Sequence, residues 1–197
     1  MKAIIMAGGK GRRLAPYTTV FPKALMPLGD TPILGIIIRQ LQSYRFEKIF
    51  VAMGYLSELI TSYFNQKNNL GTNVVFLKEK KPLGTFGAVA NIRGMGEEPF
   101  FVLNGDVLTT LDYKKLYDFH IDNKAALTVA IHRRVMDIDF GVVEISKEKQ
   151  VLTHSEKPKV ELLVGMGIYV VDPTVLKYLK KNQKIIKLYC LNNVVTY

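Results

Sequence analysis

The first thirty residues, MKAIIMAGGKGRRLAPYTTVFPKALMPLGD (1–30), contain the stretch that decides the fold. Within them, the apolar run KAIIM at 2–6 leads almost directly into the glycine-rich and basic run GGKGRR at 8–13. A short apolar run bounded by glycine is typical of a buried strand. The bare N–H groups of a glycine loop and the planar guanidinium of arginine both suit phosphate oxygens. The stretch therefore predicts a phosphate site where the first strand ends.

Strand-like and helix-like segments alternate after this loop, which indicates βαβ units and a mostly parallel sheet. The expected segments are helix 32–44, strand 48–53, helix 56–64, strand 73–77, helix 85–92, strand 100–103, helix 113–120 with Asp112 as its cap, and strand 127–132. After Arg134 the pattern changes, because the strand-like segments 141–145, 150–153 and 167–171 follow one another without a helix. We expect an α/β fold with a small antiparallel excursion and a last helix at 173–181.

Length and composition favour one ordinary soluble domain. The chain has 197 residues, with 48% apolar and 22% charged residues. No apolar run approaches the roughly 20 residues that span a bilayer. The single cysteine, Cys190, excludes an internal disulfide, so we expect a cytoplasmic protein with no membrane partner.

The net charge of +10 raises the question of a nucleic-acid partner. Residues 173–197 contain five lysines and no acid, so this segment carries +5 and leaves +5 for the first 172 residues. A body that is only mildly basic lacks the basic face expected of a nucleic-acid-binding domain. We therefore expect small phosphorylated molecules as partners and no nucleic acid.

The glycine loop does not fit two familiar phosphate motifs. The dinucleotide fingerprint requires a third glycine, but Gly9-Lys10-Gly11 is followed by Arg12-Arg13-Leu14, and no acid ends the second strand. Nothing in the chain fits the P-loop pattern. A plain tight turn would explain one or two glycines, but it leaves the arginines and the later Pro22-Lys23 unexplained.

Six motifs in order resemble the sugar-phosphate nucleotidylyltransferases, the NTP-transferase family, over residues 2–181. They are AGGKGRRLAPYT with FPKALMPLGDTPIL (7–34), EKKPLGTFGAV (79–89), LNGDVLT (103–109), FGVVEI (140–145), SEKPK (155–159) and GMGIYVV (165–171). The resemblance implies a Rossmann-like, mixed and mostly parallel sheet flanked by helices, of the nucleotide-diphospho-sugar transferase type. It also implies attack of a sugar-1-phosphate oxygen on the α-phosphorus of a nucleoside triphosphate, giving a nucleotide-sugar and pyrophosphate.

The same resemblance implies the catalytic residues and the cofactor. Arg13 would neutralise the leaving pyrophosphate, and Lys23 would hold the α-phosphate and the incoming phosphate. Asp106 is similar to the family's Mg²⁺ ligand, and Mg²⁺ commonly takes one or two carboxylates together with phosphate oxygens. Without the glycine loop, the Asn-Gly-Asp sequence around Asp106 would be read as a simple turn.

The resemblance also implies two sets of binding residues. The nucleotide-binding set is Ala7, Gly8, Gly9, Gly11, Glu79 and Gly84. The set expected at the sugar phosphate is Asn104, Gly141, Glu156, Lys157 and Gly167. A carboxylate accepts hydrogen bonds, so Glu79 favours guanine or cytosine over thymine or uracil; the alternative is a solvated charge in a run of charged residues.

The chain departs from the family pattern at its C-terminus. The family continues into a segment similar to W-x-D-I-G, whose aspartate is a second metal ligand, but this chain contains no tryptophan. We therefore expect one nucleotidyltransferase domain over 1–181 and an atypical, apparently truncated tail over 182–197. The alternative function is a non-catalytic or weakly active nucleotide- or sugar-phosphate-binding protein. Homo-oligomerisation is left open.

Overall fold

The computed structural model describes residues 1–67, 71, 73–79, 81, 83–179, 183 and 193–197. These residues form two compact units: one contains 1–130 and 167–197, and the other contains 131–166. Most of the predicted tail over 182–197, including Cys190, lies outside the described residues. Among the described residues, no helix combines the length and the apolar character needed to cross a bilayer.

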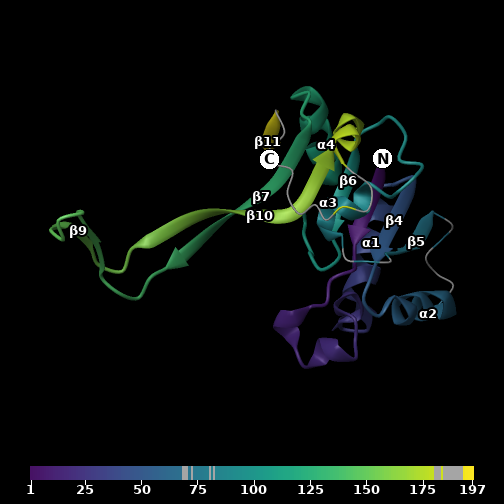
Figure 1. Ribbon diagram of the computed structural model, residues 1–197, viewed down its shortest axis with the longest axis horizontal. Coiled ribbons are helices and arrows are strands. Elements are labelled where there is room, and N and C mark those ends of the chain that lie inside the picture. The colour runs from purple at the N-terminus through teal and green to yellow at the C-terminus, as the bar shows by residue number, and fades with distance from the viewer. Residues whose placement is uncertain (68–70, 72, 80, 82, 180–182, 184–192) are drawn as a thin grey trace. The chain divides into compact units, whose positions relative to one another are not determined.

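The first unit is built on a seven-stranded sheet with the order β11-β7-β10-β6-β1-β4-β5 (Figure 1). Its strands are β1 (Lys2–Met6), β4 (Lys48–Met53), β5 (Val74–Lys78), β6 (Phe100–Asn104), β7 (Leu127–Asp137), β10 (Lys159–Val171) and β11 (Val194–Thr196). β1 pairs in parallel with β4 and β6, and β4 pairs in parallel with β5, whereas β10 is antiparallel to β6. The predicted mixed and mostly parallel sheet is confirmed.

Helices flank this sheet, as the alternating sequence pattern predicted (Figure 1). They are α1 (Ile33–Ser43), α2 (Ser57–Lys67), α3 (Gly84–Val89) and α4 (Tyr113–Asp122). The predicted cap of α4 is confirmed, because the Asp112 carboxylate accepts hydrogen bonds from the backbone N–H groups of Lys114 and Lys115. Such a bond satisfies donors that the first turn of a helix leaves free.

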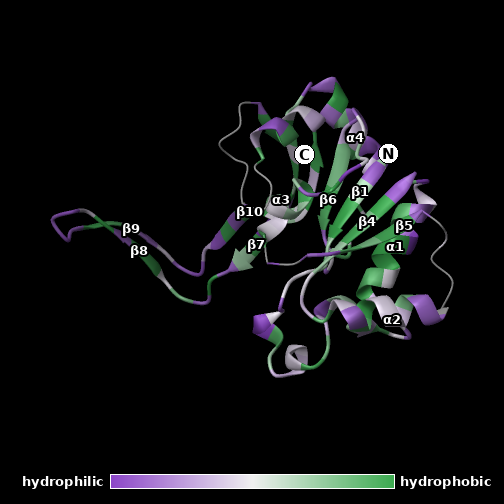
Figure 2. Ribbon diagram, turned by 45° about the vertical axis from the view of Figure 1, so that its right-hand side comes forward, coloured by the Kyte–Doolittle hydropathy of each residue, from purple (hydrophilic) through white to green (hydrophobic). Residues whose placement is uncertain are grey.

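The core lies on both faces of the central strands, which are strongly apolar (Figure 2). Ile4 of β1 stands opposite Phe50 of β4 and Val102 of β6, and each of these three side chains is at most 3% exposed. Phe101 packs edge-on against Tyr113 of α4 with ring centroids 5.6 Å apart. Strands buried on both faces are typical of parallel sheets covered by helices, and this packing fixes where the strand ends lie.

The chain between β1 and α1 contains only short elements. They are the 3₁₀ helices η1 (Arg12–Leu14), η2 (Tyr17–Thr19) and η3 (Lys23–Leu25), and the strands β2 (Pro27–Leu28) and β3 (Thr31–Pro32). β2 and β3 pair with each other in an antiparallel arrangement. The glycine-rich run therefore belongs to a connection whose backbone conformation changes from one residue to the next.

The second unit contains the predicted antiparallel excursion. β8 (Val142–Ile145) and β9 (Val151–Ser155) form a two-stranded antiparallel sheet, which confirms the expected strands at 141–145 and 150–153. β7 and β10 continue from the first unit into this one and are longer than the sequence pattern predicted.

Two features near the C-terminus differ from the sequence expectation. The predicted helix 173–181 is a 3₁₀ helix, η4 (Pro173–Tyr178), within the part of this segment that the structure describes. Asp172 caps η4 through the backbone N–H of Thr174. The strand β11 was not predicted; it adds to the edge of the sheet with Val194 opposite Leu127 of β7.

Candidate active site

A cavity of about 300 Å³ opens at the carboxyl ends of the central strands. Met6 ends β1, Asn104 ends β6, and Glu79 directly follows β5. Open α/β sheets bind their ligands at this edge. The cavity is lined by Met6, Ala7, Gly8, Gly9, Lys23, Ala24, Glu79, Gly84, Thr85, Asn104, Gly105 and Asp106. Eight of these twelve residues belong to the sets that the sequence predicted.

Backbone hydrogen bonds extend the sheet by one residue and hold these positions in place. Ala7 N–H donates to the carbonyl of Ala52 over 2.8 Å, and Gly105 N–H donates to the carbonyl of Met6 over 3.0 Å. Glu79 N–H donates to the carbonyl of Met53 over 2.7 Å. The residues that follow three different strands are therefore fixed relative to one another by the sheet itself.

Glu79 presents an unusual carboxylate to this cavity. Its Oε1 is buried and makes no hydrogen bond within the described part of the chain. Burial raises the pKa of Glu79 above its ordinary value of 4.5, because desolvation penalises the charged form. A buried acceptor without a partner is costly. This environment does not fit a fully solvated charge, and it is suited to a ligand that donates hydrogen bonds.

Gly8 is needed beside Glu79 because a side chain would not fit there. A Cβ built on Gly8 would lie 2.9 Å from Glu79 Oε2 and 3.2 Å from the backbone nitrogen of Gly54. The glycine therefore lets the first loop pass directly against the carboxylate. Gly8 and Glu79, two members of the predicted nucleotide-binding set that are 71 residues apart in the chain, are brought together in this way.

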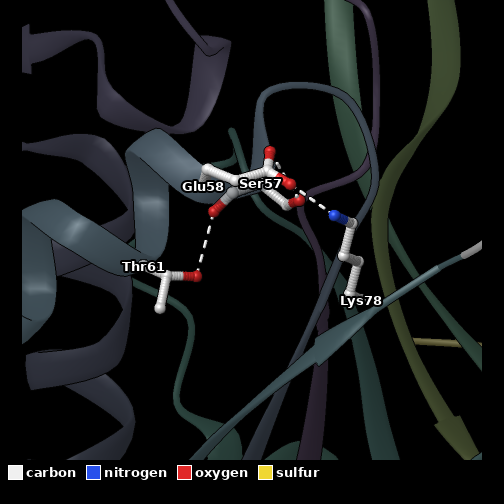
Figure 3. Close-up of polar contacts among 4 residues, drawn as sticks. All are labelled: Ser57, Glu58, Thr61 and Lys78. Atoms are coloured by element: carbon white, nitrogen blue, oxygen red, sulfur yellow. Dashed lines mark hydrogen bonds and ion pairs between the residues drawn. The ribbon is translucent and has the colours of Figure 1, made fainter.

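Lys78, the residue before Glu79, contacts helix α2 (Figure 3). The Lys78 ammonium forms an ion pair with the Glu58 carboxylate, and this hydrogen bond is the main cause that lowers the pKa of Glu58. In the same helix, the Thr61 hydroxyl donates to the carbonyl of Ser57 over 2.9 Å. The Lys78–Glu58 ion pair is exposed, so it contributes little stability, and Lys78 is not among the residues that line the cavity.

Lys23 and Asp106 form an ion pair in the cavity wall. Lys23 begins η3 directly after Pro22, whose backbone is extended, and Asp106 lies two residues beyond the end of β6. Each side chain is 31% exposed. Two of the three predicted catalytic residues are therefore in direct contact.

The cavity offers few protein ligands to a Mg²⁺ ion. Among the described residues, no group of three or more His, Cys, Asp or Glu side chains could hold a metal ion. Asp106 nevertheless supplies a hard carboxylate oxygen at the cavity, and Mg²⁺ commonly combines one or two carboxylates with substrate phosphate oxygens. The residues present thus fit a Mg²⁺ ion that shares its ligands with a bound phosphate.

Gly11 and Arg13 lie outside the cavity lining. Arg13 is exposed within η1, and Gly11 caps that helix. The Gly11 carbonyl accepts hydrogen bonds from the Thr18 hydroxyl over 2.9 Å and from Leu14 N–H over 2.8 Å. Thr18 is only 3% exposed, so the loop is anchored by a buried side chain that sequence reasoning had not singled out.

The residues expected at the sugar phosphate divide between the two units. In the first unit, Asn104 lines the cavity and Gly167 lies against it, because a Cβ on Gly167 would be 2.3 Å from Asn104 Nδ2. Gly167 also has a φ of +73°, which favours glycine. In the second unit, a Cβ on Gly141 would be 3.1 Å from Glu156 Oε2. Lys157 is an exposed residue of this second unit.

Four residues of the lining were missed by the sequence analysis: Met6, Ala24, Thr85 and Gly105. Each adjoins a residue that was predicted, in the order Ala7, Lys23, Gly84 and Asp106. Their own chemistry gave no signal, because three are apolar or glycine. Only their proximity to the motifs could have identified them.

Comparison with known proteins gives a consistent result. The family model for nucleotidyl transferases matches residues 2–189. The chain is 31% identical to a D-glycero-alpha-D-manno-heptose 1-phosphate guanylyltransferase from Aneurinibacillus thermoaerophilus, over 90% of this chain and 77% of that protein. It is 30% identical to a UTP–glucose-1-phosphate uridylyltransferase from Synechocystis, over 93% of this chain and 52% of the relative.

Solved structures support the same fold. HddC from Yersinia pseudotuberculosis superposes with a TM-score of 0.74 at 24% identity, covering 99% of this chain and 90% of that chain. The chain spans only about half the length of several of the curated relatives that it matches. With the family model covering nearly the whole chain and the fold and cavity in agreement with it, this chain belongs to the nucleotidyl transferase family.

Proposed function

We propose that this chain transfers a guanylyl group from GTP to a sugar-1-phosphate, with release of pyrophosphate. The observation that carries the proposal is the presence of three groups in one cavity: the Lys23 ammonium, the Asp106 carboxylate, and the Glu79 carboxylate with its buried Oε1. Cationic and metal-binding groups suit a polyphosphate. An acceptor without a partner suits a base that carries donors.

The proposed chemistry requires positioning and charge neutralisation more than it requires a protein base. An oxygen of the sugar-1-phosphate attacks the α-phosphorus, and the bond from this phosphorus to the oxygen bridging the α and β phosphates breaks. The bridging oxygen leaves with the electron pair as part of pyrophosphate. Lys23 would hold the α-phosphate and the incoming phosphate, and Arg13, an exposed residue of the adjoining loop, would neutralise the pyrophosphate.

Mg²⁺ would be held by Asp106 and would supply charge neutralisation on the phosphate oxygens. The sugar phosphate would be recognised by Asn104 beside Gly167 in the first unit. By the same family resemblance, a role in binding the sugar is also proposed for Gly141, Glu156 and Lys157, which belong to the second unit.

Guanine is the base that best fits Glu79. Guanine presents two adjacent donors, N1–H and the N2 amino group, to a carboxylate with two oxygens. Cytosine offers only its amino group, and uracil and thymine offer only one ring N–H. The raised pKa of Glu79 reflects desolvation that is not offset by partners, and two donors from one base would offset it.

The test is pyrophosphate release with GTP, CTP, UTP, dTTP and ATP, each with a panel of sugar-1-phosphates and Mg²⁺. We expect turnover with GTP. Turnover only with UTP or dTTP would contradict the assignment of the base. GTP binding without turnover would favour the alternative of a nucleotide-binding protein on the same scaffold.

We also propose a cytoplasmic location, where nucleoside triphosphates are available.

A further inference from the structure

Lys23 contacts the same carboxylate that the proposed function assigns to Mg²⁺. Its ammonium donates to Asp106 Oδ2, and both residues line the same cavity. An ammonium and a divalent cation repel each other and compete for one carboxylate. The ion pair is partly shielded from water, because each side chain is 31% exposed.

A cation that binds without nucleotide would find few protein ligands in this cavity after it displaced Lys23. No group of three metal-ligating side chains exists among the described residues, and the other carboxylate in the lining is Glu79. Mg²⁺ gives up its water reluctantly and relies on substrate phosphates when the protein supplies few carboxylates. A single carboxylate that already holds an ammonium is therefore a poor site for the ion alone.

A bound triphosphate would weaken the competition between Lys23 and the metal ion for Asp106. Its oxygens give the Lys23 ammonium new charge-assisted partners, and they give the metal the ligands that the protein lacks. We propose that Lys23 keeps Asp106 occupied until a triphosphate arrives, so that cation and nucleotide bind cooperatively and the cation alone binds weakly. This inference rests on the proposed nucleotide and metal roles of the cavity.

The experiment measures binding of Mn²⁺ alone, without nucleotide, by electron paramagnetic resonance of the free ion. Lys23→Gln removes the competing charge and leaves Asp106 free, so we expect Mn²⁺ to bind about tenfold more tightly than to the unmodified protein, the size expected for a partly exposed charge-assisted hydrogen bond. Asp106→Asn in the Lys23→Gln background should abolish the gain. Thermal unfolding of each variant checks that it is folded.

Lys10→Gln is the matched control. It removes one positive charge from the same loop, but the Lys10 ammonium lies 5.8 Å from the centre of the Tyr55 ring rather than on Asp106. We expect its Mn²⁺ affinity to stay within about twofold of the unmodified protein, because exposed charges are screened. An equal gain in Lys10→Gln would show a general effect of charge and would overturn the inference.

Two further outcomes would overturn the proposed competition between Lys23 and the metal ion. Equal Mn²⁺ affinity of the unmodified protein and Lys23→Gln would overturn the inference, and so would a gain that survives Asp106→Asn. The proposed function is tested separately in the unmodified protein by calorimetry with Mg²⁺ and α,β-methylene GTP, which cannot be cleaved between those phosphates. Absence of nucleotide binding there would refute the proposed function, whatever the Mn²⁺ result.

Discussion

Glu79→Gln should have opposite effects on nucleotide affinity and on the stability of the free protein. The substitution keeps the size of the side chain, but it replaces one acceptor oxygen with an amide donor and removes the charge. The amide can no longer accept from both donors of guanine. In the free protein, the same change replaces a desolvated carboxylate with an uncharged amide.

The magnitudes follow from the hydrogen bonds involved. A bidentate contact to a base is worth about 1–3 kcal/mol of discrimination, so GTP affinity should fall by roughly 10- to 100-fold. UTP affinity should fall less or rise, because an amide can accept from the uracil ring N–H and donate to the adjacent carbonyl. The free variant should gain about 1 kcal/mol, since a neutral amide costs less to desolvate than a carboxylate at this partly buried position.

The stability gain should depend on pH. Because burial raises the pKa of Glu79 in the folded state, protonation favours folding, and this contribution is lost as pH rises from 4.5 through the raised pKa. At pH 4 the carboxyl is largely neutral and the variant should match the unmodified protein. At pH 7.5 the variant should melt about 2–4 °C higher.

The assays are calorimetry with α,β-methylene GTP and its UTP counterpart, and thermal unfolding at the two pH values. Glu97→Gln is the matched control, because it removes an exposed carboxylate outside the cavity lining. Unchanged GTP affinity together with an unchanged preference between the two nucleotides would refute the assignment of Glu79 to the base. A stability difference that is independent of pH would refute the role given to its desolvation.

Three further predictions concern the scaffold. Gly167→Ala should lower the free energy of unfolding by about 1–3 kcal/mol in urea titrations, because its φ is +73° and the new Cβ would meet Asn104; an unchanged midpoint would contradict this. Asp112→Ala should cost about 1 kcal/mol by removing the cap of α4, and the melting temperature reports it. His120 is 1% exposed, and burial lowers its pKa. The free energy of unfolding should therefore fall as pH drops below 6.5 towards that lowered pKa. In His120→Gln, the dependence of the free energy of unfolding on pH should be flatter over this range.

The parallel half of the fold was predictable because each of its strands carries its own signal. Lys2–Met6 and Lys48–Met53 are apolar runs bounded by polar or glycine residues, and their bounds were predicted to the residue. The full lengths of β7 and β10 were not predictable, because their distal halves, 131–137 and 159–166, mix charged and apolar residues. β11 was missed because three residues carry no periodicity, and its pairing with β7 is a tertiary contact.

The candidate site was predictable only where motifs from separate strands converge. Residues that directly follow parallel strands lie at one edge of the sheet, which is where ligands bind. The resemblance located Lys23 and Asp106. Their direct ion pair could not be predicted, since it depends on the path of the connection between β1 and α1. The same path leaves Arg13 outside the cavity lining, although the sequence grouped it with the other catalytic residues.

The role of Glu79 depends on the environment that the fold gives to its side chain. In the sequence it stands among lysines, where a solvated charge is an equally good interpretation. In the fold, the backbone hydrogen bond to Met53 places it in the cavity wall, where Gly8 approaches so closely that a Cβ would lie 2.9 Å from Glu79 Oε2. A carboxylate held without a partner reduces stability, and such a cost is expected at binding sites, where a ligand supplies the missing bonds. The Lys23–Asp106 ion pair shows the complementary arrangement, because there each charge is satisfied in the free protein and must exchange its partner when a triphosphate binds.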